Sequence, residues 1–224
     1  MKTINIAIDG PAGAGKSSVA REVSSELGFI YVDTGALYRT VALYACDNDI
    51  KSEKELIEAL DDINIELNFI SGTQRIMLND EDVTDDIRTP EISMGASRVS
   101  AIPEVRKYLF DLQKKIAREN DVIMDGRDIG TVVLPDADLK IFLTASVDER
   151  ASRRYIELKE KSECPSYEEI REDIIKRDYN DSHRAVAPLR KADDAYTVDT
   201  TYMGFHEVCE EIISVIKTKL EIDD

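Results

Sequence analysis

The sequence predicts an α/β protein in which a parallel β-sheet is flanked by helices. Short apolar runs alternate with amphipathic stretches, a glycine-rich loop joins the first run to the first stretch, and the last stretch has a wide apolar face. Strands of a parallel sheet are buried on both faces and almost entirely apolar, and helices cover them. With 224 residues, the chain can form one substantial core, so we expect a single domain over residues 1–224.

The N-terminal part alternates strand and helix twice. Residues 4–8 form the first apolar run, and a helix is expected to begin after Gly15. Residues 29–32 form the second run, and residues 36–47 form the second helical stretch. Runs of four or five apolar residues between longer amphipathic stretches are typical of buried strands.

Residues 63–83 break this rhythm. Apolar side chains occupy every second position over residues 63–69, Ser71 and Gly72 mark a turn, and the alternation resumes over residues 76–78. This pattern predicts a β-hairpin inserted as a small lobe. The alternative is that the segment belongs to the main sheet, because two-stranded pieces are rarely stable without packing.

The middle of the chain returns to alternating helix and strand. A helix is expected to begin at Pro103, whose fixed φ suits a first helical turn, and its apolar residues recur at helical spacing. Residues 122–124 and 139–143 are the next two expected strands.

Two helical regions complete the chain. Residues 147–184 have a helical pattern rich in charge, with a break at residues 164–166. Residues 205–220 form the last helix, whose wide apolar face is expected to cover the core.

The loop at residues 10–17 is the motif that points to chemistry. Its glycines let successive backbone N–H groups face phosphates, Lys16 neutralises the β and γ oxygens, and Ser17 offers a hydroxyl to Mg²⁺. We therefore expect a nucleoside triphosphate here, the alternative being a glycine-rich turn without a ligand. Which of Ser17 and Ser18 meets Mg²⁺ stays open. The expected loop contacts are Gly10, Pro11, Ala12, Gly13, Ala14, Gly15, Lys16, Ser17 and Ser18.

A carboxylate and a set of arginines separate the possible functions of such a loop. Asp125 ends the apolar run of residues 122–124, where phosphate-loop enzymes place the acid that holds Mg²⁺; a backbone cap is the alternative. Guanidinium groups relieve the repulsion between two bound phosphates, so several convergent arginines favour a phosphate acceptor over water. The arginines expected near the strand ends are Arg39, Arg127, Arg150, Arg153, Arg154, Arg177, Arg184 and Arg190.

Composition argues against several classes of partner and of structural site. A formal charge of −17 opposes a general nucleic-acid or anionic-membrane surface, so polyanions must be bound in a local basic cleft. No stretch reads as a leader or a membrane span, and we expect a cytoplasmic location. Cys46, Cys164 and Cys209 match neither a disulfide framework nor a paired-thiolate zinc site.

Three further blocks, residues 33–39, 125–133 and 184–189, follow the phosphate loop in an order that resembles bacterial cytidylate kinases. The resemblance extends over nearly the whole chain. It implies a nucleoside-monophosphate kinase fold, with a monophosphate-binding lobe over residues 34–100 that includes the 63–83 insert, and a short helical lid over residues 150–184.

The resemblance also implies roles for individual residues. Arg39 and Arg127 would grip the acceptor phosphate, and Arg150 would lie against adenine. Arg154 and Arg184 would act on the phosphates in transfer, together with Lys16 and Arg127. The CMP-binding set would be Asp33, Thr34, Arg39, Ser97, Arg106, Arg127, Asp128, Arg177 and Asp181, with Ser97, Arg106 and Asp128 facing cytosine and Arg177 with Asp181 reading the ribose.

The resulting expectation is transfer of the γ-phosphoryl group of Mg²⁺-bound ATP to CMP or dCMP by a monomer, with no nucleic-acid or membrane partner. A UMP-type, shikimate-type or other small-molecule kinase is the nearer alternative. A regulatory GTPase is less favoured, because its guanine-reading segment contains an Asn-Lys pair and this chain has none.

Overall fold

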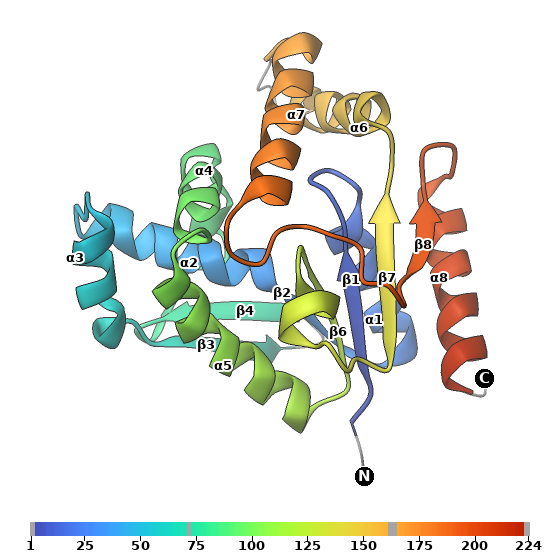
Figure 1. Ribbon diagram of the computed structural model, residues 1–224, viewed down its shortest axis with the longest axis horizontal. Helices are drawn as coiled ribbons and strands as arrows, with labels where there is room; N and C mark the ends of the chain where they lie inside the picture. The colour runs from blue at the N-terminus through green and yellow to red at the C-terminus, as the bar shows by residue number, and fades with distance from the viewer. Residues whose placement is uncertain (1–2, 71–72, 161–164, 222–224) are drawn as a thin grey trace.

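A five-stranded parallel sheet forms the centre of the protein, as predicted (Figure 1). The computed structural model describes residues 3–70, 73–160 and 165–221. The strand order is β2-β6-β1-β7-β8, and every neighbouring pair is parallel. The strands are β1 (Asn5–Asp9), β2 (Ile30–Asp33), β6 (Val122–Gly126), β7 (Leu139–Thr144) and β8 (Tyr196–Asp199).

The register brings the carboxyl ends of the strands to one edge. Asp9 at the end of β1 lies opposite Gly126 at the end of β6, and Asp33 at the end of β2 lies opposite Asp125. The four predicted strands are confirmed with ends shifted by one or two residues. The edge strand β8 was not predicted. Polar residues at several strand ends therefore lie side by side.

Helices cover both faces of the sheet. Ile6 and Ile8 of β1 pack in one buried cluster with α1 (Lys16–Leu27) and α8 (Phe205–Leu220). Ala7, which points the other way, packs in a second cluster with the end of α5 (Pro103–Glu119). This alternation is why strands buried on both faces carry apolar residues at nearly every position.

The predicted β insert is confirmed, and it forms a sheet separate from the main one. Its strands are β3 (Ile65–Ile70), β4 (Thr73–Leu78) and the short β5 (Glu81–Asp82), all antiparallel; the expected turn at Ser71 and Gly72 lies outside the described residues. The insert shares one core with α2 (Thr34–Asp47), α3 (Glu53–Glu58), α4 (Pro90–Val99) and α5. Short 3₁₀ turns occupy Leu60–Asp62 and Asp86–Arg88.

Two helices stand over the carboxyl edge of the sheet, at the top of Figure 1. They are α6 (Val147–Glu160) and α7 (Tyr167–His183), which share a small core of Ala151, Leu158, Ile170 and Ile174. Ser166 begins α7 with a capping box to Glu169. The helical pattern predicted for residues 147–184 is confirmed. Cys164, at the predicted break, lies outside the described residues.

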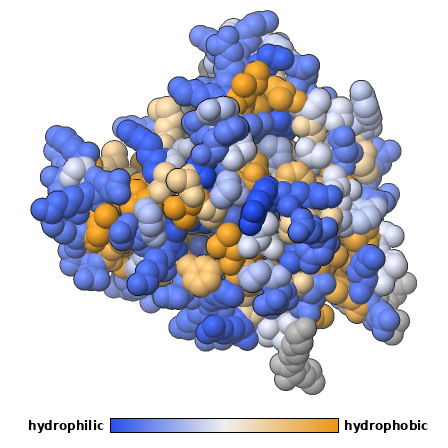
Figure 2. Space-filling model, in the orientation of Figure 1, coloured by the Kyte–Doolittle hydropathy of each residue, from blue (hydrophilic) through white to orange (hydrophobic). Residues whose placement is uncertain are grey.

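The surface matches the charged composition. The face drawn in Figure 2 is mostly hydrophilic, with small apolar patches. None of the helices in the described ranges is both long and apolar enough to cross a membrane. Cys46 is an exposed free thiol and Cys209 a buried one.

Candidate active site

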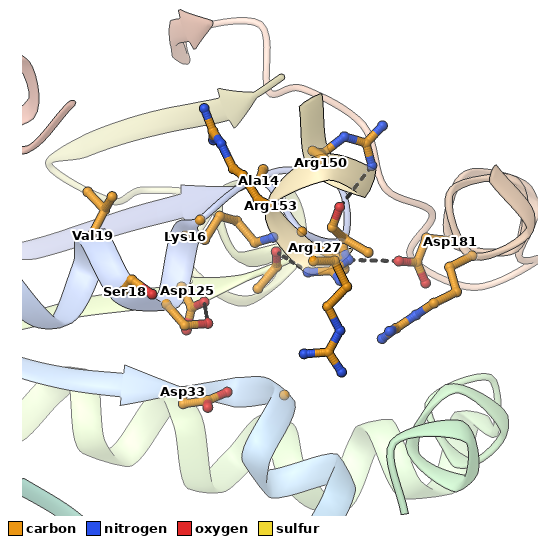
Figure 3. A pocket seen from close by; sticks show the side chains of 18 of the residues that line it. Ala14, Lys16, Ser18, Val19, Asp33, Asp125, Arg127, Arg150, Arg153 and Asp181 are labelled. Atoms are coloured by element: carbon orange, nitrogen blue, oxygen red, sulfur yellow. Dashed lines mark hydrogen bonds and ion pairs between the residues drawn. The ribbon is translucent and has the colours of Figure 1, made fainter. Parts of the chain in front are cut away.

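A cleft of about 750 Å³ lies at the carboxyl edge of the main sheet, between the loop after β1, the start of α2, α4, the end of β6, and α6 and α7 (Figure 3). All of the predicted site residues line it except Gly10, Pro11 and Arg106. Segments far apart in the sequence thus meet in one cavity. The predicted residues that line it are Ala12, Gly13, Ala14, Gly15, Lys16, Ser17, Ser18, Asp33, Thr34, Arg39, Ser97, Asp125, Arg127, Asp128, Arg150, Arg154, Arg177, Asp181 and Arg184.

The backbone conformation of the phosphate loop requires glycine, as Gly10 and Gly15 show. Gly10 has φ 153°, and a Cβ there would lie 1.9 Å from the backbone oxygen of Leu143. Gly15 has φ 88° and begins α1, so the conformation itself favours glycine there. The loop therefore curls directly from the end of β1 into the N-terminus of α1, where helix N–H groups favour an anion.

Lys16 is buried at the first position of α1. Its Nζ donates to the backbone oxygen of Pro11 at 2.8 Å. Burial, together with the neighbouring Arg127 guanidinium, lowers the pKa of Lys16 from 10.5 to about 7. A phosphate in the loop would favour the ammonium form and give it a charged partner.

Asp125 is buried at the end of β6, with a hydroxyl at each carboxylate oxygen. Ser17 Oγ donates to Oδ2 at 2.8 Å, and the Tyr31 hydroxyl donates to Oδ1 at 3.1 Å. Burial raises the pKa of Asp125 from 3.8 to about 6, and the Asp33 carboxylate acts in the same direction. Ser17, rather than the exposed Ser18, thus lies beside the predicted metal ligand.

Two arginines of the cleft are paired with aspartates. Arg39 Nη2 lies 2.9 Å from Asp33 Oδ2 on the α2 side. Arg127 Nε donates to Asp181 Oδ2 at 2.7 Å, joining the end of β6 to α7 (Figure 3). Both pairs are partly buried. Each guanidinium keeps further N–H groups that a phosphate could engage.

Asp128 bridges two more arginines. Arg184 Nη2 donates to its Oδ1 at 2.9 Å, and Arg106 Nη2 contacts its Oδ2. Arg106 is buried behind Asp128, where it also donates to the backbone oxygen of Ser100 at 3.2 Å and lies 5.7 Å from the Tyr38 ring centroid. Arg106 therefore reaches the cleft through Asp128 rather than lining it.

Arg150 connects the α6–α7 wall of the cleft to the phosphate loop. Its Nη1 donates to the backbone oxygen of Ala12 at 2.8 Å, and its Nη2 lies 2.6 Å from Asp178 Oδ2 on α7. Its side chain is buried, so most of the guanidinium is already engaged. Arg154, by contrast, is exposed and pairs with Glu157 at 2.8 Å.

The cleft is locally cationic in an acidic chain. Eight basic and six acidic side chains line it, whereas the chain as a whole carries −17. This satisfies the expectation that an anion must be bound in a basic cleft. The basic residues are Lys16, Arg39, Arg127, Arg150, Arg153, Arg154, Arg177 and Arg184; the acidic ones are Asp33, Asp125, Asp128, Glu149, Glu157 and Asp181.

Several lining residues had no predicted role. Tyr38 lies in the block of residues 33–39 that carries the family resemblance, but nothing in the sequence indicated that its side chain would line the cleft. Met203 and Phe205 line the cleft at the start of α8. Phe205 is 44% exposed, and an exposed aromatic residue at the start of an amphipathic helix is the signal that could have marked it.

Comparison with known proteins places the chain in a family. The family model described as Cytidylate kinase matches residues 6–218. The chain belongs to the cytidylate kinase family. Among the relatives of this name, one from Caldicellulosiruptor saccharolyticus is 49% identical over 217 residues, and one from Alkaliphilus metalliredigens is 50% identical over 214 residues; each alignment covers 96% of both chains.

The cytidylate kinase assignment confirms the predicted resemblance and does not favour the shikimate-type and switch alternatives. A solved structure of an uncharacterized protein from Eubacterium ventriosum has a TM-score of 0.53 to this chain, with 15% identity over 97% of this chain and 99% of that one. At that identity the likeness concerns the fold alone.

Proposed function

We propose that this chain transfers the γ-phosphoryl group of ATP to CMP or dCMP, giving ADP and CDP or dCDP. One observation carries the proposal: the phosphate loop and the arginine–aspartate pairs predicted to read the acceptor line the same cleft. A cleft that held only a nucleoside triphosphate would not need a second cationic wall. The family's name agrees with this substrate class.

Mg²⁺ fits beside Ser17 and Asp125. Their hydroxyl and carboxylate oxygens are hard ligands of the kind that Mg²⁺ prefers. Among the described residues, no group of three His, Cys, Asp or Glu side chains could hold a metal ion, so phosphate oxygens and water would complete the coordination. When bound, Mg²⁺ would neutralise charge on the β- and γ-phosphates.

On the donor side, the loop N–H groups and Lys16 would hold the ATP phosphates. Arg150 is assigned to the adenine side of the cleft, where its bonds to Ala12 and Asp178 fix the plane of the guanidinium. Arg154 is exposed on α6, where it pairs with the partly exposed Glu157. It can therefore turn toward the transferring phosphoryl group at little cost, because exposed ion pairs are weak.

On the acceptor side, Arg39 and Arg127 would grip the CMP phosphate. Each is now held by an aspartate, so the phosphate would enter a preformed arrangement and share or replace that partner. Planar guanidinium groups bind phosphate oxygens in pairs, which fixes orientation as well as charge. Thr34 lies beside Asp33 at this wall, and Arg184 is assigned as a further phosphate clamp.

Cytosine recognition is assigned to Asp128 and Ser97. The cytosine amine donates, and a carboxylate with two arginines on its lone pairs still has acceptor capacity. Arg106 and Arg184 would hold Asp128 ionised and oriented, so Arg106 acts on the base through Asp128. UMP would point an oxygen at this carboxylate, and an unpaired buried acceptor costs about 1–3 kcal/mol.

Ribose recognition and closure are assigned to α6 and α7. Arg177 and Asp181 lie on the cleft wall formed by α7, opposite the acceptor wall of residues 34–100. Closure of residues 150–184 would exclude water and bring these groups onto the sugar and phosphates. The acceptor phosphate is already anionic, so positioning and charge stabilisation supply the rate without a strong base. We propose that the chain does this as a monomer.

The test is a coupled assay with Mg²⁺-ATP and a panel of CMP, dCMP, UMP, AMP, GMP and shikimate. We expect CMP and dCMP to be phosphorylated with kcat/KM about ten- to a hundredfold above UMP. Turnover with shikimate or with UMP in preference to CMP would overturn the proposal. ATP hydrolysis at a rate that no acceptor changes would indicate a nucleotide-hydrolysing switch protein instead.

A further inference from the structure

Asp9 is a buried carboxylate that the proposed chemistry does not use. It ends β1 immediately before the phosphate loop, and it is 4% exposed. Oδ1 accepts the backbone N–H of Ile129 at 2.8 Å, and Oδ2 accepts that of Gly130 at 2.7 Å. These two donors begin the single π-helical turn Ile129–Val133 that follows β6.

The segment between β6 and that turn contains two residues, Arg127 and Asp128. At one end, Gly126 is the register partner of Asp9 in the β1–β6 ladder. At the other end, Ile129 is bonded to the Asp9 side chain. The two residues assigned to the acceptor are thus held on both sides by one residue, which itself adjoins the loop assigned to ATP.

The surrounding contacts show that this connection is tight. A Cβ on Gly126 would lie 2.7 Å from Ile129 Cδ1, so the chain doubles back closely after β6. A Cβ on Gly130 would lie 3.4 Å from Asp9 Oδ2 and 3.1 Å from Lys140 Cδ. Both oxygens of a buried carboxylate accept N–H groups, an arrangement in which charge-assisted bonds offset the cost of burial.

We propose that Asp9 is a positioning residue, whose carboxylate holds Arg127 and Asp128 at a fixed distance from the phosphate loop and so sets acceptor binding and base choice. The inference rests on the proposed function. A rigid link of this kind matters because transfer between two bound phosphates requires donor and acceptor to be aligned within a fraction of an ångström. The β1–β6 ladder alone ends at Gly126 and leaves the next two residues unsupported from that side.

The test replaces Asp9 by asparagine, which keeps the size but turns one acceptor into a donor facing an N–H group. For Asp9→Asn we expect KM for CMP to rise about tenfold, while KM for Mg²⁺-ATP stays within about twofold. The preference for CMP over UMP should fall, because Asp128 is displaced with the turn. A purely structural role would lower the active fraction and leave both KM values and the preference unchanged.

Asp121→Asn is the matched control. Asp121 Oδ1 accepts the backbone N–H of Ile4 at 2.6 Å, so this carboxylate is bonded next to the amino end of β1, whereas Asp9 lies at the carboxyl end beside the cleft. We expect its KM values for both substrates to equal those of the wild type. A rise in KM for CMP in this variant too would show a general loss of sheet order and overturn the inference.

Two further measurements keep the inference falsifiable. Should Asp9→Asn fail to fold, Asp9→Glu keeps the carboxylate but lengthens the side chain by one methylene, which displaces the turn bonded to it, and an unchanged KM for CMP in that variant overturns the inference. Calorimetric titration with CMP measures acceptor binding without turnover. A wild type that binds CMP but does not phosphorylate it contradicts the proposed function, whereas an active wild type with an unchanged KM in Asp9→Asn contradicts only the role of Asp9.

Discussion

Lys16 has a buried amino group whose partner is the backbone oxygen of Pro11, so its protonation is sensitive to what enters the loop. Replacing it by alanine removes the cation assigned to the β- and γ-phosphates, and we expect kcat to fall by at least about 10²–10³-fold. Thermal unfolding should be nearly unchanged or shifted upward, since a poorly solvated charge is removed. Folded Lys16→Ala protein with wild-type turnover would contradict the assignment.

The lowered pKa of Lys16 has a consequence for proton uptake. Between pH 7 and pH 10.5 the native side chain holds fewer protons than the same side chain in the unfolded chain, so this group makes the protein more stable as the pH rises through that window. ATP favours the ammonium form. We therefore expect binding of Mg²⁺-ATP at pH 8 to take up a proton, seen as a dependence of the calorimetric heat on buffer ionisation.

The control for proton uptake is Lys16→Met, which should bind nucleotide more weakly and lose the buffer dependence. At pH 8 Asp9 and Asp125, with pKa values near 6, are already ionised and contribute no uptake. Heats that are equal in all buffers for the wild type would contradict the lowered pKa of Lys16.

Asp128 is the residue to which we assign the choice of base. Asp128→Asn keeps the shape but offers an amide that can donate to the UMP oxygen, so the kcat/KM ratio of CMP to UMP should fall about tenfold or more. Arg106 would lose its buried partner, and we expect the free energy of unfolding to drop by about 3 kcal/mol. The measurement is the substrate ratio at a temperature where the variant stays folded; an unchanged ratio would remove Asp128 from base recognition.

At the scale of elements, strands were predicted correctly where burial on both faces gives a continuous run of apolar residues. The runs that became β1, β2, β6 and β7 are apolar on both faces. The missed strand β8 is an edge strand with a single buried residue, Val198, so its sequence carries almost no strand signal. Its place depends on pairing with β7, which no local pattern encodes.

Two missed helices did carry signals. Ser52 and Glu55 form a capping box at the start of α3, and Thr89 caps α4 with Pro90 at its first position. Both helices are short, and their buried residues belong to the core that contains α2 and the small sheet instead of to the clusters of the main sheet. The π-helical turn after β6 has no local sequence signal, since it is held by Asp9 from 120 and 121 positions away.

The small sheet reaches the cleft through Gln74 on β4. Its Oε1 accepts the backbone N–H of Asp33 at 3.1 Å, next to the carboxylate that holds Arg39. For Gln74→Ala we expect KM for CMP to rise a few-fold, with KM for ATP unchanged, and the free energy of unfolding to fall by about 1 kcal/mol.

Arg75→Ala is the control for Gln74. Arg75 neighbours Gln74 on β4 and forms an exposed ion pair with Asp82 at 3.6 Å. Loss of this pair should leave the KM values for both substrates unchanged and lower the free energy of unfolding by less than about 1 kcal/mol. Equal effects of the two substitutions on KM for CMP would show that the small sheet acts on the site only through its general stability.

For the whole molecule, the sequence predicted which residues gather at the site but not how they are paired. The motifs lie at strand ends, and the carboxyl ends of parallel strands meet at one edge, so their convergence follows from the topology. The ion-pair partners cannot be derived from the topology in this way, because Arg127 and Asp181 are 54 positions apart and Arg184 and Asp128 are 56 apart. Such pairs are set by the packing of α7 over the sheet.

The distribution of apolar burial predicts unequal stability across the molecule. The core shared by α6 and α7 contains four buried apolar residues within the described ranges, whereas the cluster of the main sheet with α1 and α8 is several times larger. Amides of α6 and α7 should therefore exchange through local opening of a few kcal/mol, and those of β1 and β6 only through global unfolding. Hydrogen exchange followed by mass spectrometry measures both.

Bound substrates should reduce the difference in hydrogen exchange between α6 and α7 and the main sheet. Arg150, Arg153 and Asp181 tie α6 and α7 to the rest of the protein at the cleft, so ATP and CMP together should slow exchange in these helices more than either alone. ATP alone is the control, because we assign it to the loop and α6 and not to the acceptor wall. Helices α6 and α7 that exchange as slowly as β1 without ligand would show that they are part of the main cooperative unit, and closure would then have to come from another element.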